Sequence, residues 1–179
     1  MPRPLRLLVA LVAALATVVL PAPVPASAGV LDVTCIPPSS DLVTYSPPLT
    51  TTAQNVSINA ATQYGPCVSL GEPGVTSGSR SFQGTGSRSC LGLVQAGTET
   101  FTITWNTGQT STVTVNKISN IVGATLVVTF TGTVTSGLFA GGTVLQTVTG
   151  LATDILQCTA GLGTVSSIYS LVTLEITSV

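Results

Sequence analysis

Side chains that could perform chemistry are scarce in this chain of 179 residues. It has no histidine, and Lys117 is its one lysine. Without an imidazole, neither a Ser-His-Asp nor a Cys-His arrangement can be assembled. A serine-lysine pair would have to use Lys117, which follows an alternating segment and is expected to be a solvated residue at a strand edge. These nucleophilic enzyme classes are therefore not predicted.

Carboxylates offer the remaining route to catalysis. A glycoside hydrolase needs two of them roughly 5 to 10 Å apart, and no spacing among the six acidic residues marks such a pair. Glu99 and Glu175 lie in alternating segments and are expected to be outward charges that keep a sheet soluble. No two acids lie within four residues of each other, so no calcium loop is predicted. We expect no catalytic residue, metal or cofactor. The acidic residues are Asp32, Asp41, Glu72, Glu99, Asp154 and Glu175.

Four cysteines, Cys35, Cys67, Cys90 and Cys158, form no C-x-x-C pair. With no histidine beside them, an even number of cysteines in an exported chain indicates disulfides rather than a metal site. Four cysteines allow three connectivities. We favour Cys35 with Cys67 and Cys90 with Cys158.

The first 28 residues have the pattern of an export signal. Arg3 and Arg6 precede an apolar run from residue 7 to 20, and Ala26-Ser27-Ala28 matches a cleavage site. Residues 29–179 are then a single mature domain, secreted and with no membrane segment. That domain keeps three cations against six acids, which excludes the cationic surface that nucleic acid requires.

Hydrophobic residues alternate with polar ones along most of the mature chain. Phe101, Ile103 and Trp105 share one face of a predicted strand, and residues 111–115 alternate in the same way. Between them, Gly108 can take the positive φ that a short hairpin loop requires. A hairpin over residues 101–115 is therefore predicted.

Further alternating segments bring the number of expected strands to about eight. These segments are residues 124–135, 172–176, 30–36, 53–60, 76–86 and 142–150. A short helix is expected near 151–157, and the proline-containing segment 36–49 is expected to be a loop or a covered edge. An antiparallel β-sandwich of immunoglobulin-like Greek-key topology is the predicted all-β fold; a barrel is the alternative.

Two tyrosines are candidates for a binding surface. Tyr45 lies in the proline-rich segment, and Tyr64 precedes Gly65. Rigid amphipathic rings suit sugars and protein surfaces, so the expected partner is an extracellular ligand, glycan or protein. The alternative is that both rings cap the ends of the sandwich.

Several motifs, taken in order, resemble those of a family of small exported actinobacterial proteins of unassigned function. The most specific is Trp105-Asn106-Thr107-Gly108-Gln109-Thr110-Ser111-Thr112; the others are Val33-Thr34-Cys35, Tyr45-Ser46-Pro47-Pro48-Leu49, Cys67, Thr76-Ser77-Gly78, Ser89-Cys90, Gly132-Thr133-Val134-Thr135-Ser136-Gly137 and Cys158. The resemblance implies export and a β fold and carries no site residues.

The sequence thus predicts a secreted, non-catalytic β-sandwich module with a binding, surface or matrix role. One alternative is a small-ligand carrier, because the composition is similar to that of the apoproteins of enediyne antibiotics. Such a carrier would need a concave apolar pocket. The other alternative is a carboxylate-dependent hydrolase.

Overall fold

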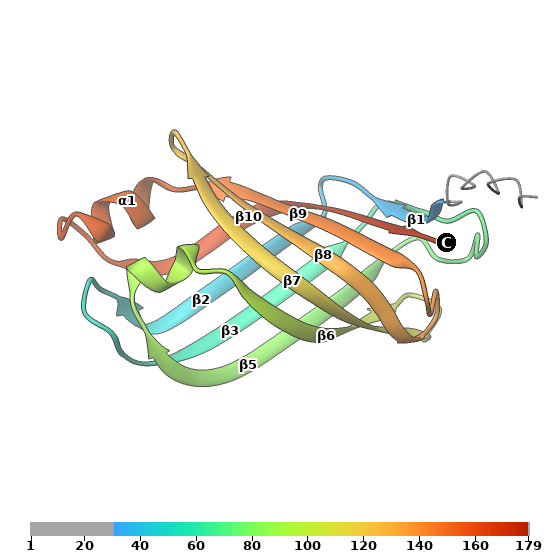
Figure 1. The fold of residues 1–179 in the computed structure, drawn as a ribbon, viewed down its shortest axis with the longest axis horizontal. Coiled ribbons are helices and arrows are strands. Elements are labelled where there is room, and N and C mark those ends of the chain that lie inside the picture. The colour runs from blue at the N-terminus through green and yellow to red at the C-terminus, as the bar shows by residue number, and fades with distance from the viewer. Residues whose placement is uncertain (1–30, 179) are drawn as a thin grey trace, which may run out of the picture.

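The computed structural model describes residues 31–178, which form strands and two short helical segments (Figure 1). The strands are β1 (Leu31–Cys35), β2 (Ser40–Leu49), β3 (Gln54–Tyr64), β4 (Cys67–Val68), β5 (Gly78–Arg88), β6 (Gly97–Trp105), β7 (Thr110–Val122), β8 (Thr125–Gly137), β9 (Thr143–Leu151) and β10 (Val165–Thr177). The helical segments are the 3₁₀ turn η1 (Cys90–Val94) and the helix α1 (Thr153–Thr159). The predicted signal peptide, residues 1–28, lies outside the described residues. Among residues 31–178, no helix is long and apolar enough to cross a membrane.

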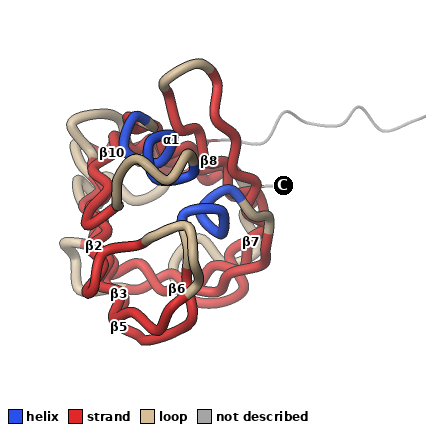
Figure 2. Tube along the Cα trace, turned by 90° about the vertical axis from the view of Figure 1, so that its left-hand side faces the viewer, coloured by secondary structure: helices blue, strands red, loops and turns tan. Residues whose placement is uncertain are grey.

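Eight of the strands form a closed antiparallel barrel. The order β2-β3-β5-β6-β7-β8-β9-β10 is continuous, and β2 also pairs with β10, where Leu42 lies opposite Tyr169. Viewed from one end, the strands outline a ring (Figure 2). The short strands β1 and β4 extend the sheet beyond this closure. β2 pairs with β10 only as far as Leu171, and β1 pairs with the residues of β10 that follow, from Leu174 to Thr177.

The predicted immunoglobulin-like sandwich is therefore wrong, although the all-β class is correct. Strands that are neighbours in the barrel follow one another along the chain, except that β4 lies between β3 and β5 in sequence and pairs with β1. The connections are therefore up-and-down rather than a Greek key. Period-two alternation shows that each strand buries one face, and this holds equally in a sandwich and in a barrel. The pairing of β2 with β10 closes the barrel and distinguishes it from a sandwich.

The segment 36–49, expected to be a loop or covered edge, instead contributes β2. Its ladder with β3 runs from Ser40 to Ser46 and stops before Pro47 and Pro48. The ladder with β10 is also interrupted there, between Thr44 and Leu49. The prolines thus lie where no backbone donor is required, which is how a strand tolerates them.

The hairpin predicted over residues 101–115 is present as β6 and β7. Thr104 lies opposite Thr110, and Gly108 has a φ of 83° in the connecting turn. The helix expected near 151–157 is α1. Both predictions depended on local sequence signals alone.

Threonine hydroxyls cover much of the outer face. On β6 and β7, Thr100 and Thr114 are hydrogen bonded at 3.0 Å, and Thr102 and Thr112 at 3.3 Å. Threonine suits a pleated surface because branching at Cβ restricts its χ1 rotation, and its hydroxyl keeps the surface polar. A chain with 6% charged residues can in this way present a hydrated exterior.

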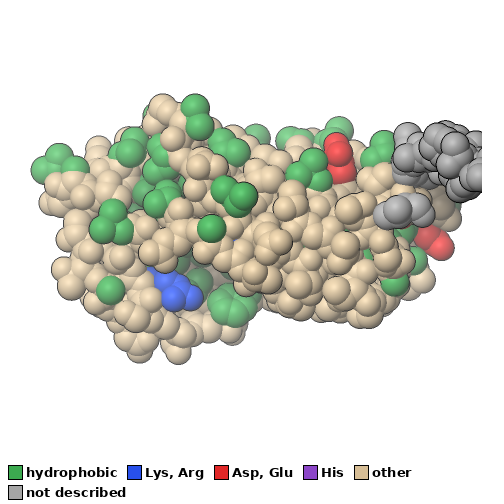
Figure 3. Space-filling model, in the orientation of Figure 1, with side chains coloured by type: hydrophobic (Ala, Val, Ile, Leu, Met, Phe, Trp, Pro, Cys, Tyr) green, Lys and Arg blue, Asp and Glu red, His purple; other side chains and the backbone are tan. Residues whose placement is uncertain are grey.

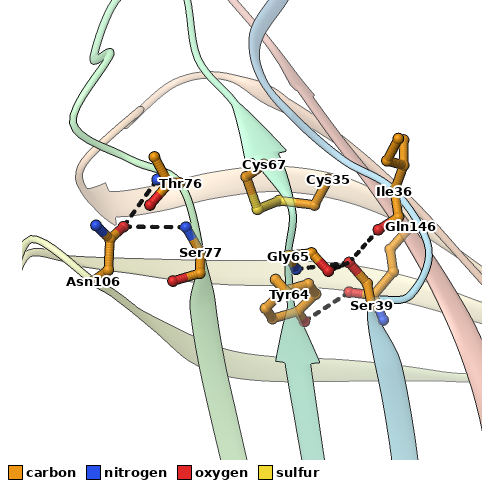
Figure 4. Close-up of a disulfide and its surroundings, with 10 residues drawn as sticks. All are labelled: Cys35, Ile36, Ser39, Tyr64, Gly65, Cys67, Thr76, Ser77, Asn106 and Gln146. Carbon is orange, nitrogen blue, oxygen red and sulfur yellow. Dashed lines mark hydrogen bonds between the residues drawn. A yellow bond between two sulfur atoms is a disulfide. The ribbon is translucent and has the colours of Figure 1, made fainter.

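One half of the barrel interior is filled. Trp105 packs edge-on against Phe139, with ring centroids 5.7 Å apart, and its indole Nε1 donates to Ser111 Oγ at 2.8 Å. Tyr64 is buried beside it and donates to Gln146 Oε1 at 2.9 Å. Close to this core, the Cys35–Cys67 disulfide joins β1 to β4 (Figure 4). This bond is one of the two predicted.

Close contact between β7 and β8 depends on Gly132, and we expect Gly132→Ala to destabilise the barrel. A Cβ there would overlap the carbonyl oxygen of Thr114 and lie 2.7 Å from Cα of Val115. Because both are backbone atoms, they cannot rotate away. We predict a loss of about 3 kcal/mol in the free energy of unfolding, the upper part of the range for overpacking.

Chemical denaturation of this variant checks the prediction against Gly97→Ala. A Cβ at Gly97, also in a barrel strand, meets nothing within 4 Å. Equal effects of the two substitutions would show that β7 and β8 are not in close contact at Gly132.

Candidate functional site

The other half of the barrel interior holds a cavity of about 740 Å³. This volume lies within the range of about 300 to 1,000 Å³ of small-molecule sites. Its lining combines residues from all eight barrel strands with part of η1. The lining residues are Asp41, Val43, Tyr45, Ile58, Ala60, Arg80, Ser81, Phe82, Arg88, Gly92, Leu93, Glu99, Thr100, Phe101, Thr102, Lys117, Ser119, Leu126, Val128, Phe130, Val148, Ile168 and Ser170.

The cavity has a side opening because β5 and β6 separate. They pair only at Gly78 with Trp105 and Ser79 with Thr104, after which β5 pairs with β3 alone and β6 with β7 alone. Figure 1 shows the two strands diverging toward η1. Phe82, in the unpaired part of β5, is 57% exposed although it lines the cavity. The space-filling view shows cationic and hydrophobic atoms together in a recess on this face (Figure 3).

Two glycines on β5 leave room for the large side chains beside them. Phe82, Gly84, Gly86 and Arg88 alternate along the strand and so share its inner face. A Cβ at Gly84 would lie 2.6 Å from Cζ of Phe82, and one at Gly86 would lie 3.5 Å from Nη1 of Arg88. Both long side chains therefore fold along the strand, over the glycines.

The charged residues of the cavity form two groups. In the first, Lys117 Nζ lies 3.2 Å from Glu99 Oε1. In the second, Thr62 Oγ1 donates to the carboxylate of Asp41 and accepts from Arg80 Nε at 2.9 Å. Thr62 thus links a buried carboxylate to a guanidinium without direct contact between them.

The guanidinium of Arg80 is also held by aromatic rings. Its Cζ lies 3.9 Å from the ring centroid of Phe101 and 5.8 Å from that of Phe130. A cation over a ring face at these distances is attracted by the ring quadrupole. Arg80 is therefore positioned by Thr62 on one side and by Phe101 on the other.

The predicted outward position of Glu99 is wrong, and so is the solvated edge position of Lys117. Both point into the barrel and line the cavity, whereas Glu175 is exposed as predicted. A signal was available: Glu99 is in phase with Phe101 and Ile103, and Lys117 is in phase with Val113 and Val115. The alternation of β6 and β7 predicts inward side chains for both residues, whereas their charge alone predicts exposure.

The end of the barrel beside the cavity is covered by η1 and α1. The Cys90–Cys158 disulfide joins them, and both cysteines are fully buried. Figure 2 shows the two helical segments within the outline of the strand ring. Gly92 and Leu93 of η1 contribute to the cavity wall. The second predicted disulfide therefore fixes the cover of the cavity.

The two candidate tyrosines have different surroundings. Tyr45 is half-buried and lines the cavity. Its burial, with a smaller effect of the nearby carboxylate of Asp41, raises its pKa to about 12. Tyr64 is 2% exposed, so it belongs to the interior rather than to a binding surface or an end cap with its hydroxyl outward. Burial raises the pKa of Tyr64 to about 12.

Comparison of the chain with family models, with curated proteins and with solved structures finds no match. The resemblance to exported actinobacterial proteins therefore stays a prediction. Any functional conclusion depends on the cavity itself.

Tyr64 should make the protein less stable in alkaline solution. Its folded pKa of about 12 lies above the ordinary tyrosine value of 10.0, so its stabilising effect is complete below pH 10 and is lost as the pH rises through 12. From this group alone we expect the free energy of unfolding to fall by about 2 kcal/mol between pH 10 and 12.

Urea unfolding across this pH range, with Tyr64→Phe as the comparison, measures the effect. The variant should be less stable at pH 8, because Gln146 Oε1 loses its donor. Between pH 10 and 12 its stability should fall less steeply than that of the parent, which retains both Tyr45 and Tyr64. Parallel curves for the two proteins would contradict the assignment.

Proposed function

We propose that this protein is a secreted, non-catalytic β-barrel that binds a small, largely apolar molecule inside its lumen. The observation that carries the proposal is the cavity of about 740 Å³. Protein interiors are normally packed without voids larger than a water molecule. A volume this large in one half of a barrel whose other half is filled is typical of a ligand site.

The lining supports an apolar ligand. Aliphatic side chains from β2, β3, β8, β9 and β10 form one continuous side of the cavity. They are Val43, Ile58, Ala60, Leu126, Val128, Val148 and Ile168. Transfer of an apolar group from water to such a surface is favourable by about 25 cal/mol per Å². The ligand would enter through the opening between β5 and β6.

The acidic residues of the cavity favour binding over catalysis. The carboxylate of Glu99 is paired with Lys117, and that of Asp41 accepts a hydrogen bond from Thr62. A general acid needs a raised pKa, and a nucleophile needs a free position facing the reacting atom. Both carboxylates already have partners in the protein wall. The hydrolase alternative is therefore not proposed.

Two disulfides in a chain of this size are typical of exported proteins. Together with the signal pattern of residues 1–28, they support secretion. An extracellular carrier must keep its site intact without chaperones, and disulfides at both ends of the barrel suit that need.

Filling the cavity should abolish binding of a neutral apolar probe. Ala60 lines the cavity, and Ala61, the next residue of β3, is exposed on the outer face. We expect the parent to bind N-phenyl-1-naphthylamine, whose fluorescence rises in apolar surroundings. Ala60→Trp should weaken this binding at least about tenfold, equivalent to about 1.4 kcal/mol, while Ala61→Trp should leave it unchanged. A parent that gives no fluorescence increase, or an equal loss in both variants, would overturn the proposal.

The two disulfides should differ in their effect on the same binding. The Cys90→Ser, Cys158→Ser double variant loses a bond that closes 68 residues and should be destabilised by roughly 4 kcal/mol. Because η1 is then free to leave the cavity, the affinity for the neutral probe should also fall. Cys35→Ser with Cys67→Ser should lower the melting temperature similarly and leave the probe affinity unchanged, since that bond lies near the filled end. Unchanged probe affinity in the first variant would show that η1 does not form the cavity wall.

A further inference from the structure

Every lysine and arginine of residues 31–178 lines the cavity. These are Arg80, Arg88 and Lys117. We propose that the ligand is an amphipathic organic anion, with an acidic head group bound by Arg80 and an apolar body in the lumen. This inference rests on the proposed function and adds the chemical class of the ligand.

The charge balance of the cavity leaves one positive charge without a counterion. Three cations face two carboxylates, Asp41 and Glu99, which gives a net charge of +1. The ion pair with Glu99 neutralises Lys117. Among the described residues, neither Arg80 nor Arg88 has a carboxylate within 4.0 Å. Cations at a partly apolar site are costly unless they are paired, so an anionic ligand would supply the missing charge.

Arg80 is held in a geometry suited to an oxyanion. Its Nε donates to Thr62 Oγ1, and its Cζ lies 3.9 Å from the ring centroid of Phe101. No hydrogen bond within residues 31–178 uses its two terminal nitrogens. A guanidinium with free terminal nitrogens can donate two parallel hydrogen bonds to a carboxylate, sulfate or phosphate. Its position is fixed beforehand, so little entropy would be lost on binding.

The positions of the charges match those of an amphipathic ligand. Arg80 and Arg88 belong to β5, at the side opening, whereas the aliphatic wall lies on β2, β3 and β8 to β10. A head group would stay near the opening while the apolar body extends inward. Inside the cavity, Ser119 is 7% exposed and its Oγ has no hydrogen-bond partner in the described structure. This hydroxyl is available to a polar atom farther along the ligand.

Two probes that differ in one acidic group test the inference on the full mature protein. N-phenyl-1-naphthylamine is neutral, and 8-anilinonaphthalene-1-sulfonate has the same aromatic framework with a sulfonate. We expect the anionic probe to bind about tenfold more tightly at low salt, as charge-assisted hydrogen bonds predict. Arg80→Gln should remove most of this advantage, because it should lower the affinity for the anionic probe far more than the affinity for the neutral probe. Glu175→Gln, a charge change on the outer face of β10, should alter neither affinity.

The neutral probe also reports whether each variant retains its lumen, so misfolding cannot imitate the expected result. Equal affinities for the two probes in the parent, or an anionic preference that persists in Arg80→Gln, would overturn the anionic class and leave the lumen site standing. Failure of the parent to bind either probe would overturn the proposed function and this inference with it.

Discussion

The hydrogen bonds between β2 and β10 close the sheet into a barrel with a lumen. Residues 40–44 and 167–171 join the first and last strands of the barrel, although more than a hundred positions separate them in sequence. Once this ladder forms, every inward side chain faces a common lumen rather than a second sheet. The lumen must then be filled or left open. Trp105, Tyr64 and their neighbours fill one end, and smaller aliphatic residues leave the other end hollow.

The charges and the side opening follow from the same geometry. The unpaired parts of β5 and β6 interrupt the wall beside Arg80 and Arg88. Long charged side chains can occupy this part of the lumen because solvent reaches them through the opening. The outer face meanwhile remains hydrated through threonine hydroxyls, such as those of Thr100 and Thr114. The three cations of the described residues thus all line the cavity, and threonine hydroxyls help to keep the exterior polar.

Local signals predicted the strands, the hairpin at Gly108, the short helix and the disulfides. The barrel could not be predicted, because its closure is a contact between distant segments that leaves no mark on alternation within a strand. The β2 strand could not be predicted, because its prolines are tolerated only where its ladders with β3 and β10 stop. Two cavity residues could be predicted: Glu99 and Lys117 follow the inward alternation of their strands, although charge alone predicts exposure. That they line one cavity with Arg80 and Arg88 follows only from the closed barrel.

Residue-resolved amide hydrogen exchange tests the closed but side-opened barrel most directly. The amides that join residues 40–44 to 167–171 should be as protected as those between β7 and β8. Along residues 80–88 and 97–103, protection should alternate, because every second amide of each strand points to the neighbour that it has lost. Continuous protection along β5 and β6 would mean that the wall is sealed. Rapid exchange throughout the β2–β10 ladder would mean that the barrel is not closed.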